Sequence, residues 1–206
     1  MRICAFGDSF THGTGDDTCL GWVGRLAANS RQGGTDLTLY NLGVRRETSA
    51  DVAARLAQEA LPRRNADEPF GIQLCVGAND CVLVDGTPRV AAERSVEQLR
   101  AMITQSQGWG EVLVIGALPV PTDLGALERV RALNEQQAGL CAAMQVPFVT
   151  AAAFVASNPV WRADLASGDG IHPGQAGYAA LAGFLSTQAA VVQFWRSLNG
   201  PRARTC

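Results

Sequence analysis

The chain has 206 residues and a formal net charge of −2, a length that suits one domain and a charge that provides no basic surface for nucleic acid. The sequence has 17 arginines and no lysine, which excludes chemistry that needs a lysine amine, such as Schiff-base formation. The six cysteines form no CxxC pair, and no apolar run reaches the roughly 18 residues of a membrane span. We therefore expect no metal, no cofactor, no membrane span and no nucleic-acid partner.

The N-terminal residues are strand-like from Arg2 and lack the charged and apolar regions of a secretory signal peptide. A cytoplasmic protein is expected, provided that no leader has been removed. The sequence does not indicate the oligomeric state.

Along the chain, short apolar runs alternate with longer helical patterns. The runs are apolar almost throughout, as strands covered on both faces should be, and they occupy residues 2–6, 37–41, 70–76, 111–115 and 147–150. The helical patterns occupy residues 20–30, 49–60, 88–107, 125–144, and 173 towards 198. This alternation predicts an α/β fold in which a parallel sheet lies between two layers of helices.

Local signals refine these elements. Thr48 and Asp51 have the spacing of a capping box at the start of the second helix, and Pro173 suits the first turn of the last one. Because no change of composition marks a linker, we expect a single domain over residues 1–199. Residues 200–206 are expected to form a disordered tail.

Two distant segments carry the groups that nucleophilic acyl transfer needs. Ser9 directly follows the first predicted strand, and Asp169 stands three residues before His172 near the other end of the chain. A serine hydroxyl becomes a good nucleophile when a base takes its proton, and a carboxylate can orient that base. Glycines at 168 and 170 allow Asp169 to fold back onto the imidazole. The same spacing also fits a helix-capping turn with a surface histidine.

A third polar segment, Gly-Ala-Asn-Asp at residues 77–80, directly follows the third predicted strand. The side-chain amide of Asn79 can donate a hydrogen bond to a developing oxyanion, as can the backbone N–H groups of Ser9 and of the loop after the second strand. The alternative is a turn in which Asn79 and Asp80 satisfy their own backbone.

Taken in order, four segments of the chain resemble the four sequence blocks of the SGNH (GDSL) hydrolases, from residue 3 to about 178. They are Gly-Asp-Ser at residues 7–9, the segment 41–48, Gly-Ala-Asn-Asp at 77–80 and Asp-Gly-Ile-His-Pro at 169–173. The resemblance implies a flavodoxin-like, three-layer α/β/α fold whose five parallel strands have the order 2-1-3-4-5. It also implies Ser9 as nucleophile, His172 as base, Asp169 as the partner that orients the base and Asn79 as an oxyanion donor. In such a sheet the crevice opens between strands one and three, where Ser9 and Asn79 stand.

The chain departs from the family pattern in its second block. There the family carries a glycine whose backbone N–H completes the oxyanion hole, and here Arg46 occupies that place. Any residue except proline keeps this N–H, but a positive φ would strain Arg46. Gly43 is an alternative donor whose register fits less well. Arg45 and Arg46 are either a solvated pair at a helix entry or an attraction for an acidic leaving group or a carboxylated substrate.

Other residues are candidates for lining the substrate. His12 lies three residues from Ser9 but has no carboxylate at a position to orient it, so we expect a polar or substrate-lining role. Asp8, Val82 and Pro119 are further lining candidates. The apolar runs that contain Val82 and Pro119 can form the wall of an acyl pocket, or they can pack onto the core. Two tryptophans, at 22 and 161, are expected to pack inside the fold and not to hold a sugar.

These observations predict a serine hydrolase that cleaves small or short-chain carboxylic esters through an acyl-enzyme on Ser9. An acyl-thioesterase or a carbohydrate deacetylase would use the same groups. Two other classes stay open: a binding module without activity, and a phosphatase with Asp8 as nucleophile. The second class requires another aspartate two residues later, and position 10 is phenylalanine.

Overall fold

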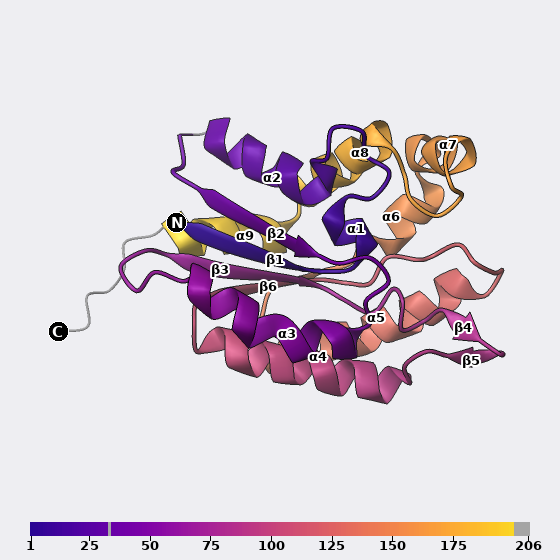
Figure 1. The fold of residues 1–206 in the computed structure, drawn as a ribbon, viewed down its shortest axis with the longest axis horizontal. Coiled ribbons are helices and arrows are strands. Elements are labelled where there is room, and N and C mark those ends of the chain that lie inside the picture. Colours follow the sequence, from indigo (N-terminus) through magenta and orange to yellow (C-terminus); the bar gives the residue numbers. More distant parts are fainter. Residues whose placement is uncertain (33, 200–206) are drawn as a thin grey trace.

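The computed structural model describes residues 1–32 and 34–199, so the expected tail at 200–206 lies outside the described residues. A five-stranded parallel sheet forms its centre (Figure 1). In spatial order the strands are β2 (Thr38–Gly43), β1 (Arg2–Gly7), β3 (Phe70–Cys75), β6 (Glu111–Ile115) and β7 (Phe148–Val149). The predicted fold class and strand order are therefore confirmed. A small antiparallel hairpin, β4 (Leu83–Val84) and β5 (Thr87–Pro88), was not predicted.

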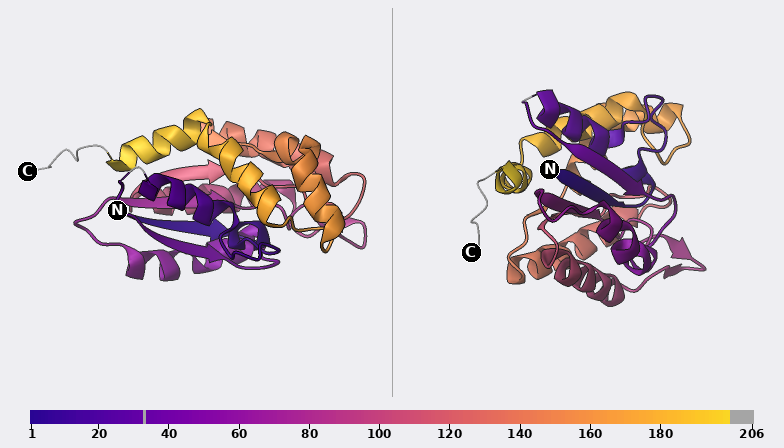
Figure 2. Two further views of the ribbon diagram at one scale, coloured as in Figure 1. Left: turned by 90° about the horizontal axis from the view of Figure 1, so that it is seen from above. Right: turned by 60° about the vertical axis from the view of Figure 1, so that its left-hand side comes forward.

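Helices cover both faces of the sheet (Figure 2). One face carries α2 (Gly21–Gln32), α6 (Ala152–Ser157), α7 (Pro159–Ser167), α8 (Gln175–Ser186) and α9 (Ala189–Asn199). The other face carries α3 (Ser49–Ala60), α4 (Ala92–Gln107) and α5 (Ala126–Ala143), and a short 3-10 helix, η1 (Leu61–Arg63), follows α3. The four-residue helix α1 (Ser9–His12) follows β1 directly.

The alternation of side chains along β1 builds the two cores. Ile3 and Ala5 point into the cluster with α2 and α8, while Cys4 and Phe6 point into the cluster with α3 and α4. All four side chains are completely buried, which explains why the strand reads as a continuous apolar run.

Several predicted helix ends are wrong. Helix α4, which was predicted over residues 88–107, begins at Ala92 because Pro88 belongs to β5. The last helical pattern is two helices, which are separated at residues 187–188. Pro173 lies before the first turn of α8, because this helix begins after Gly174. A free N–H of that first turn, from Gly177, donates to the carboxylate of Asp164 in α7 at 2.7 Å. The capping box of Thr48 and Asp51 is present as predicted.

This topology places the loops after β1, β2 and β3 at one edge of the sheet, on the right in Figure 1. Within residues 1–32 and 34–199, no helix has the length and apolar character needed to span a membrane.

Candidate active site

Ser9 is the first residue of α1 and lies immediately beyond the carboxyl end of β1. Asp8 caps this helix, because its Oδ1 atom accepts the Phe10 N–H at 2.9 Å. The Ser9 N–H belongs to the first helical turn, where backbone donors have no carbonyl partner within the helix. A Cβ at Gly7 would collide with the Thr11 side chain and the Cys75 carbonyl, so the chain can approach β3 this closely only with glycine at that position.

Ser9, His172 and Asp169 form a continuous chain of hydrogen bonds. The distance from Ser9 Oγ to His172 Nε2 is 2.8 Å, and the distance from His172 Nδ1 to Asp169 Oδ2 is 2.7 Å. Ser9 and His172 are only 7 % and 8 % exposed, while the Asp169 side chain is 47 % exposed. The structure therefore brings the three groups together in the geometry that activates a serine hydroxyl.

The loop around Asp169 fixes this geometry locally. The second carboxylate oxygen, Oδ1, accepts the backbone N–H groups of Ile171 at 2.9 Å and His172 at 2.7 Å, while Gly170 adopts a positive φ of 78°. Burial alone would raise the pKa of Asp169, but the hydrogen bonds from the His172 backbone and imidazole outweigh it, and the pKa falls to about 2. The carboxylate is thus held ionised beside the imidazole.

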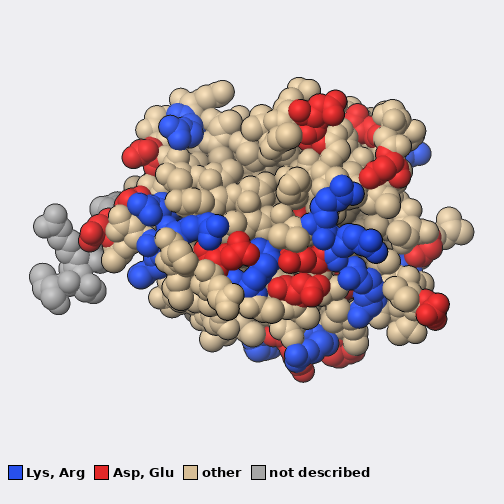
Figure 3. Space-filling view, viewed as in Figure 1, with Lys and Arg blue, Asp and Glu red and all other residues tan. Residues whose placement is uncertain are grey.

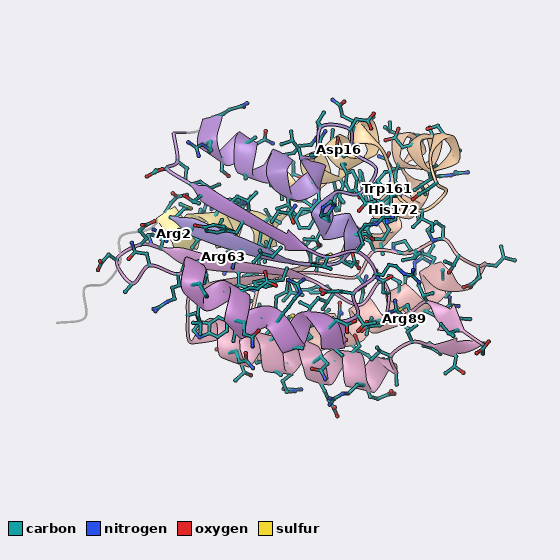
Figure 4. The ribbon with its side chains drawn as sticks, in the orientation of Figure 1. Arg2, Asp16, Arg63, Arg89, Trp161 and His172 are labelled. Carbon is teal, nitrogen blue, oxygen red and sulfur yellow. The ribbon has the colours of Figure 1, made fainter. Side chains whose placement is uncertain are left out.

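Aromatic side chains pack around His172. The Phe10 ring lies 5.5 Å from the imidazole and 6.0 Å from the Trp161 ring, centroid to centroid. Trp161 in turn contacts Tyr178 edge-on at 5.8 Å, and the Tyr178 hydroxyl donates to the Thr14 carbonyl at 2.9 Å. Figure 4 labels His172 and Trp161 near the ends of the strands. The packing of these rings limits the orientations open to the imidazole.

Asn79 joins the loop after β3 to the loop after β2. Its Nδ2 atom donates to the Glu47 carbonyl at 3.0 Å and lies 3.4 Å from Asp8 Oδ2. The Glu47 carbonyl and the Asp8 carboxyl are therefore the partners of the two amide protons.

Arg46 adopts the conformation that glycine favours. Its φ is +70°, and the Glu47 N–H donates to the Val44 carbonyl at 3.4 Å, so that Arg46 occupies the third position of a turn. A turn in which only the third residue has a positive φ is of type II, and glycine is usual at this position. An arginine there is strained by roughly 1 kcal/mol. Arg46 thus has the positive φ that was identified from the sequence as a source of strain.

Gly43 is a poor alternative donor. Its N–H donates to the Asn41 side-chain oxygen at 3.1 Å, and the residue is the buried last position of β2. A Cβ at this position would collide with the backbone of His12, so Gly43 serves the close approach of β2 to α1.

Two buried carboxyl groups lie behind the nucleophile, and the sequence did not indicate their burial. Asp8 and Asp80 are 2 % and 1 % exposed. Desolvation, helped by the nearby charge of Asp80, raises the pKa of Asp8 to about 7 despite the opposing hydrogen bond from the Phe10 N–H. Asp80 Oδ1 accepts the Ser49 N–H at 2.8 Å, whereas its Oδ2 atom is buried without a hydrogen-bond partner.

The remaining substrate-lining candidates lie in different surroundings. Pro119 lines a cavity of about 430 Å³ between α5, α6 and α7, and Gly170 lines it too. Val82 is half-buried and packs against the larger core. His12 is exposed at the end of α1, where its Nδ1 atom lies 3.4 Å from Thr14 Oγ1. Trp22 packs in the core, while the buried Trp161 both packs and lines the cavity.

Chemically, this arrangement can transfer a proton from Ser9 to His172 and stabilise the imidazolium through Asp169. In residues 1–32 and 34–199, no group of three or more histidine, cysteine or acidic side chains is arranged to hold a metal ion.

Comparison with known proteins agrees with this geometry. The model of the GDSL-like lipase/acylhydrolase family matches residues 5–180 of the chain. No curated protein sequence matches it.

Solved structures share the fold. A catalytic mutant of an acetylxylan esterase from Geobacillus stearothermophilus is 16% identical, with a TM-score of 0.71, and the match covers 92% of this chain and 93% of that one. The lipase/acylhydrolase from Enterococcus faecalis is 22% identical, with a TM-score of 0.70 and coverages of 92% and 95%. LAE5, a hydrolase from the metagenome of Lake Arreo, Spain, is 19% identical, with a TM-score of 0.71 and coverages of 97% and 96%. At these identities the likeness is one of fold.

Proposed function

Because the chain belongs to the GDSL-like lipase/acylhydrolase family, we propose that it hydrolyses small or short-chain carboxylic esters through an acyl-enzyme on Ser9. One observation carries the proposal: Ser9 Oγ lies 2.8 Å from His172 Nε2, and the other imidazole nitrogen lies 2.7 Å from Asp169. A serine in a simple turn has no need of this alignment.

The proposed reaction has two halves. Ser9 Oγ attacks the ester carbonyl while His172 takes its proton, and Asp169 holds the imidazole in the tautomer that accepts at Nε2. The imidazolium then protonates the departing alcohol, which leaves the acyl group on Ser9. Water, activated by His172 in the same way, releases the acid and restores the serine.

Three donors are assigned to the oxyanion of the tetrahedral intermediate: the N–H of Ser9, the N–H of Arg46 and the Nδ2 of Asn79. The free first-turn N–H of Ser9 supports the first assignment. The glycine-like turn at Arg46 supports the second, and the engagement of the Gly43 N–H by Asn41 argues against Gly43. The third assignment is supported by the long 3.4 Å contact of the Asn79 amide with Asp8, the residue next to Ser9, because an oxyanion can displace so weak a bond.

The phosphatase alternative is disfavoured by the surroundings of Asp8. This carboxyl is buried, its raised pKa reduces its charge near neutral pH, and it is used to cap α1. A nucleophilic carboxylate needs to be ionised and accessible.

A fluorophosphonate probe tests the proposal directly. The wild-type protein should be labelled on Ser9 and should hydrolyse a panel of aryl esters of graded chain length, with acyl-thioesters and acetylated sugars as further arms. Ser9→Ala should lose both labelling and hydrolysis while keeping the wild-type fold by circular dichroism. Equal hydrolysis by Ser9→Ala and wild type would overturn the proposal.

A further inference from the structure

Arginines gather on one side of the crevice. Figure 3 shows basic side chains where the β2–α3 loop and the β4–β5 hairpin lie in Figure 1. Arg45 and Arg46 belong to that loop, and Arg89 directly follows the hairpin. All three residues are exposed. The Arg89 guanidinium donates to the Arg46 carbonyl at 3.0 Å, which ties the two segments together.

The positive charge of these three residues is compensated only in part, by the nearby carboxylate of Asp51, whose charge interacts with that of Arg89. Among the described residues, none of them takes part in an ion pair within 4.0 Å. The neighbouring Glu47 is committed to Arg55 at 2.6 Å. One oxygen of Asp51, Oδ2, accepts from both the backbone N–H and the hydroxyl of Thr48. The surface therefore keeps a concentrated positive potential beside the site.

This potential lies close to the reacting groups. Asn79 holds the carbonyl of Glu47, which is the next residue after Arg46, and the same amide lies 3.4 Å from Asp8. The Val44 N–H also donates to the Gly7 carbonyl at 3.0 Å, so the loop is fixed against the end of β1. The loop that carries Arg45 and Arg46 is thus held against the residues that immediately precede Ser9. Exposed charges act over a Debye length of about 8 Å.

The opposite flank of the site has another character. The cavity beside Gly170 is walled mainly by apolar groups, including Pro119, Trp161 and Leu165. Its charged residues are Asp123, which is paired with Arg129 at 2.6 Å, and the exposed Arg162. A substrate long enough to reach from this cavity past Ser9 to the β2–α3 loop would meet apolar groups at one end and the three arginines at the other.

We propose that the preferred substrates are esters or thioesters that carry an anionic group, such as a phosphate, sulfonate or carboxylate, which binds at Arg45, Arg46 and Arg89. The apolar part of the substrate occupies the cavity beside Gly170. This inference rests on the proposed esterase function and names the substrate class of the same site.

Matched esters isolate the charge. The acetate ester of 4-hydroxybenzenesulfonate is compared with that of 4-hydroxybenzenesulfonamide, which is neutral and has a similar shape, and with a trimethylammonium analogue. A second series places the carboxylate on the acyl side. It compares a glutarate monoester with the ester in which the free carboxylate is replaced by a neutral carboxamide. The first series reports a charge on the leaving group, and the second reports a charge on the acyl group.

The quantity measured is the ratio of kcat/KM for the anionic ester to that for its neutral match. In at least one series the wild type should favour the anion by about tenfold. This ratio should fall as the salt concentration rises from about 20 to 500 mM, because salt in this range screens the interaction between exposed charges. Arg45→Glu should reduce the ratio by about tenfold and Arg45→Gln by about threefold. Arg46 and Arg89 are avoided as first variants because their substitution also changes the turn.

Arg100→Glu is the matched control. This exposed residue on α4 gives the same change of net charge without touching the crevice, so the wild-type ratio should persist. Arg162→Glu tests the other flank and should have a smaller effect than Arg45→Glu.

The outcomes separate the two proposals. Hydrolysis of neutral esters that depends on Ser9, with a ratio near one in both series, overturns the anion site and leaves the esterase function standing. An equal loss of ratio in Arg45→Glu and Arg100→Glu also overturns the site. Absence of all ester and thioester hydrolysis overturns both proposals.

Discussion

The side-chain amide of Asn79 donates to the backbone carbonyl of Glu47 at 3.0 Å, so this residue holds the β2–α3 loop in place. This loop contains Arg46, whose N–H is assigned to the oxyanion. The position of one oxyanion donor therefore depends on the side chain of another.

Asn79→Ala should lower kcat by on the order of 10²-fold with little change in KM, because its donor is needed only when charge develops in the transition state. Steady-state kinetics on a neutral aryl ester provides the measurement. Urea denaturation of the same variant reports the separate loss of the loop contact. A change confined to KM would remove Asn79 from the oxyanion hole.

Arg46→Gly should have a free energy of unfolding about 1 kcal/mol higher than that of Arg45→Gly, since both variants add the same freedom to the unfolded chain but only the first relieves strain at a positive φ. Arg45→Gly is the matched control, because the φ of Arg45 is not positive and glycine there only adds freedom to the unfolded chain. This control should be destabilised by up to about 1 kcal/mol. Equal loss of stability in both variants would contradict the strain at Arg46.

The stability of the protein should depend on pH through Asp8. Its pKa is raised to about 7 by burial, so the folded state binds the proton more tightly than the unfolded chain does. This contribution is complete below about pH 4 and is lost as the pH rises towards 7. Asp8→Asn should show a smaller decline of unfolding free energy between pH 4.5 and 7.5, measured by urea denaturation. Asp17→Asn, which changes an exposed carboxylate, should keep the wild-type decline.

Asp169→Asn should reduce kcat/KM by on the order of 10³- to 10⁴-fold, because the imidazole loses the partner that fixes its tautomer. The amide oxygen can still accept the N–H groups of Ile171 and His172, so the loop should keep its shape. Activity and a crystal structure of the variant test both parts. A loss of less than tenfold would show that Asp169 does not orient His172.

Much of the fold was predictable from sequence because its strands are buried on both faces. The run at 2–6 has only apolar or cysteine side chains after Arg2, and each of them contacts a helix layer. Helix α3 matches its prediction at both ends, since Thr48 and Asp51 form a local signal that needs no tertiary contact.

The segment between β7 and α8 was missed. Helix α7 begins at Pro159 with Asn158 as its cap, a signal that the sequence contained. Its importance for the site was not predictable, because the cavity at Trp161 exists only once α7 packs against α5 and α6. The burial of Asp80 and the positive φ of Arg46 likewise depend on contacts between elements.

Ser9 and His172 lie 163 positions apart in the sequence, so their contact depends on the folding of the segments between them. Ser9 emerges during synthesis well before His172, so a partly made chain carries the serine without its proposed activating partner. The central strands must be aligned before the final loop can reach Ser9. Under the proposed mechanism, hydrolytic activity should therefore appear only after the sheet and the loop of His172 have folded together.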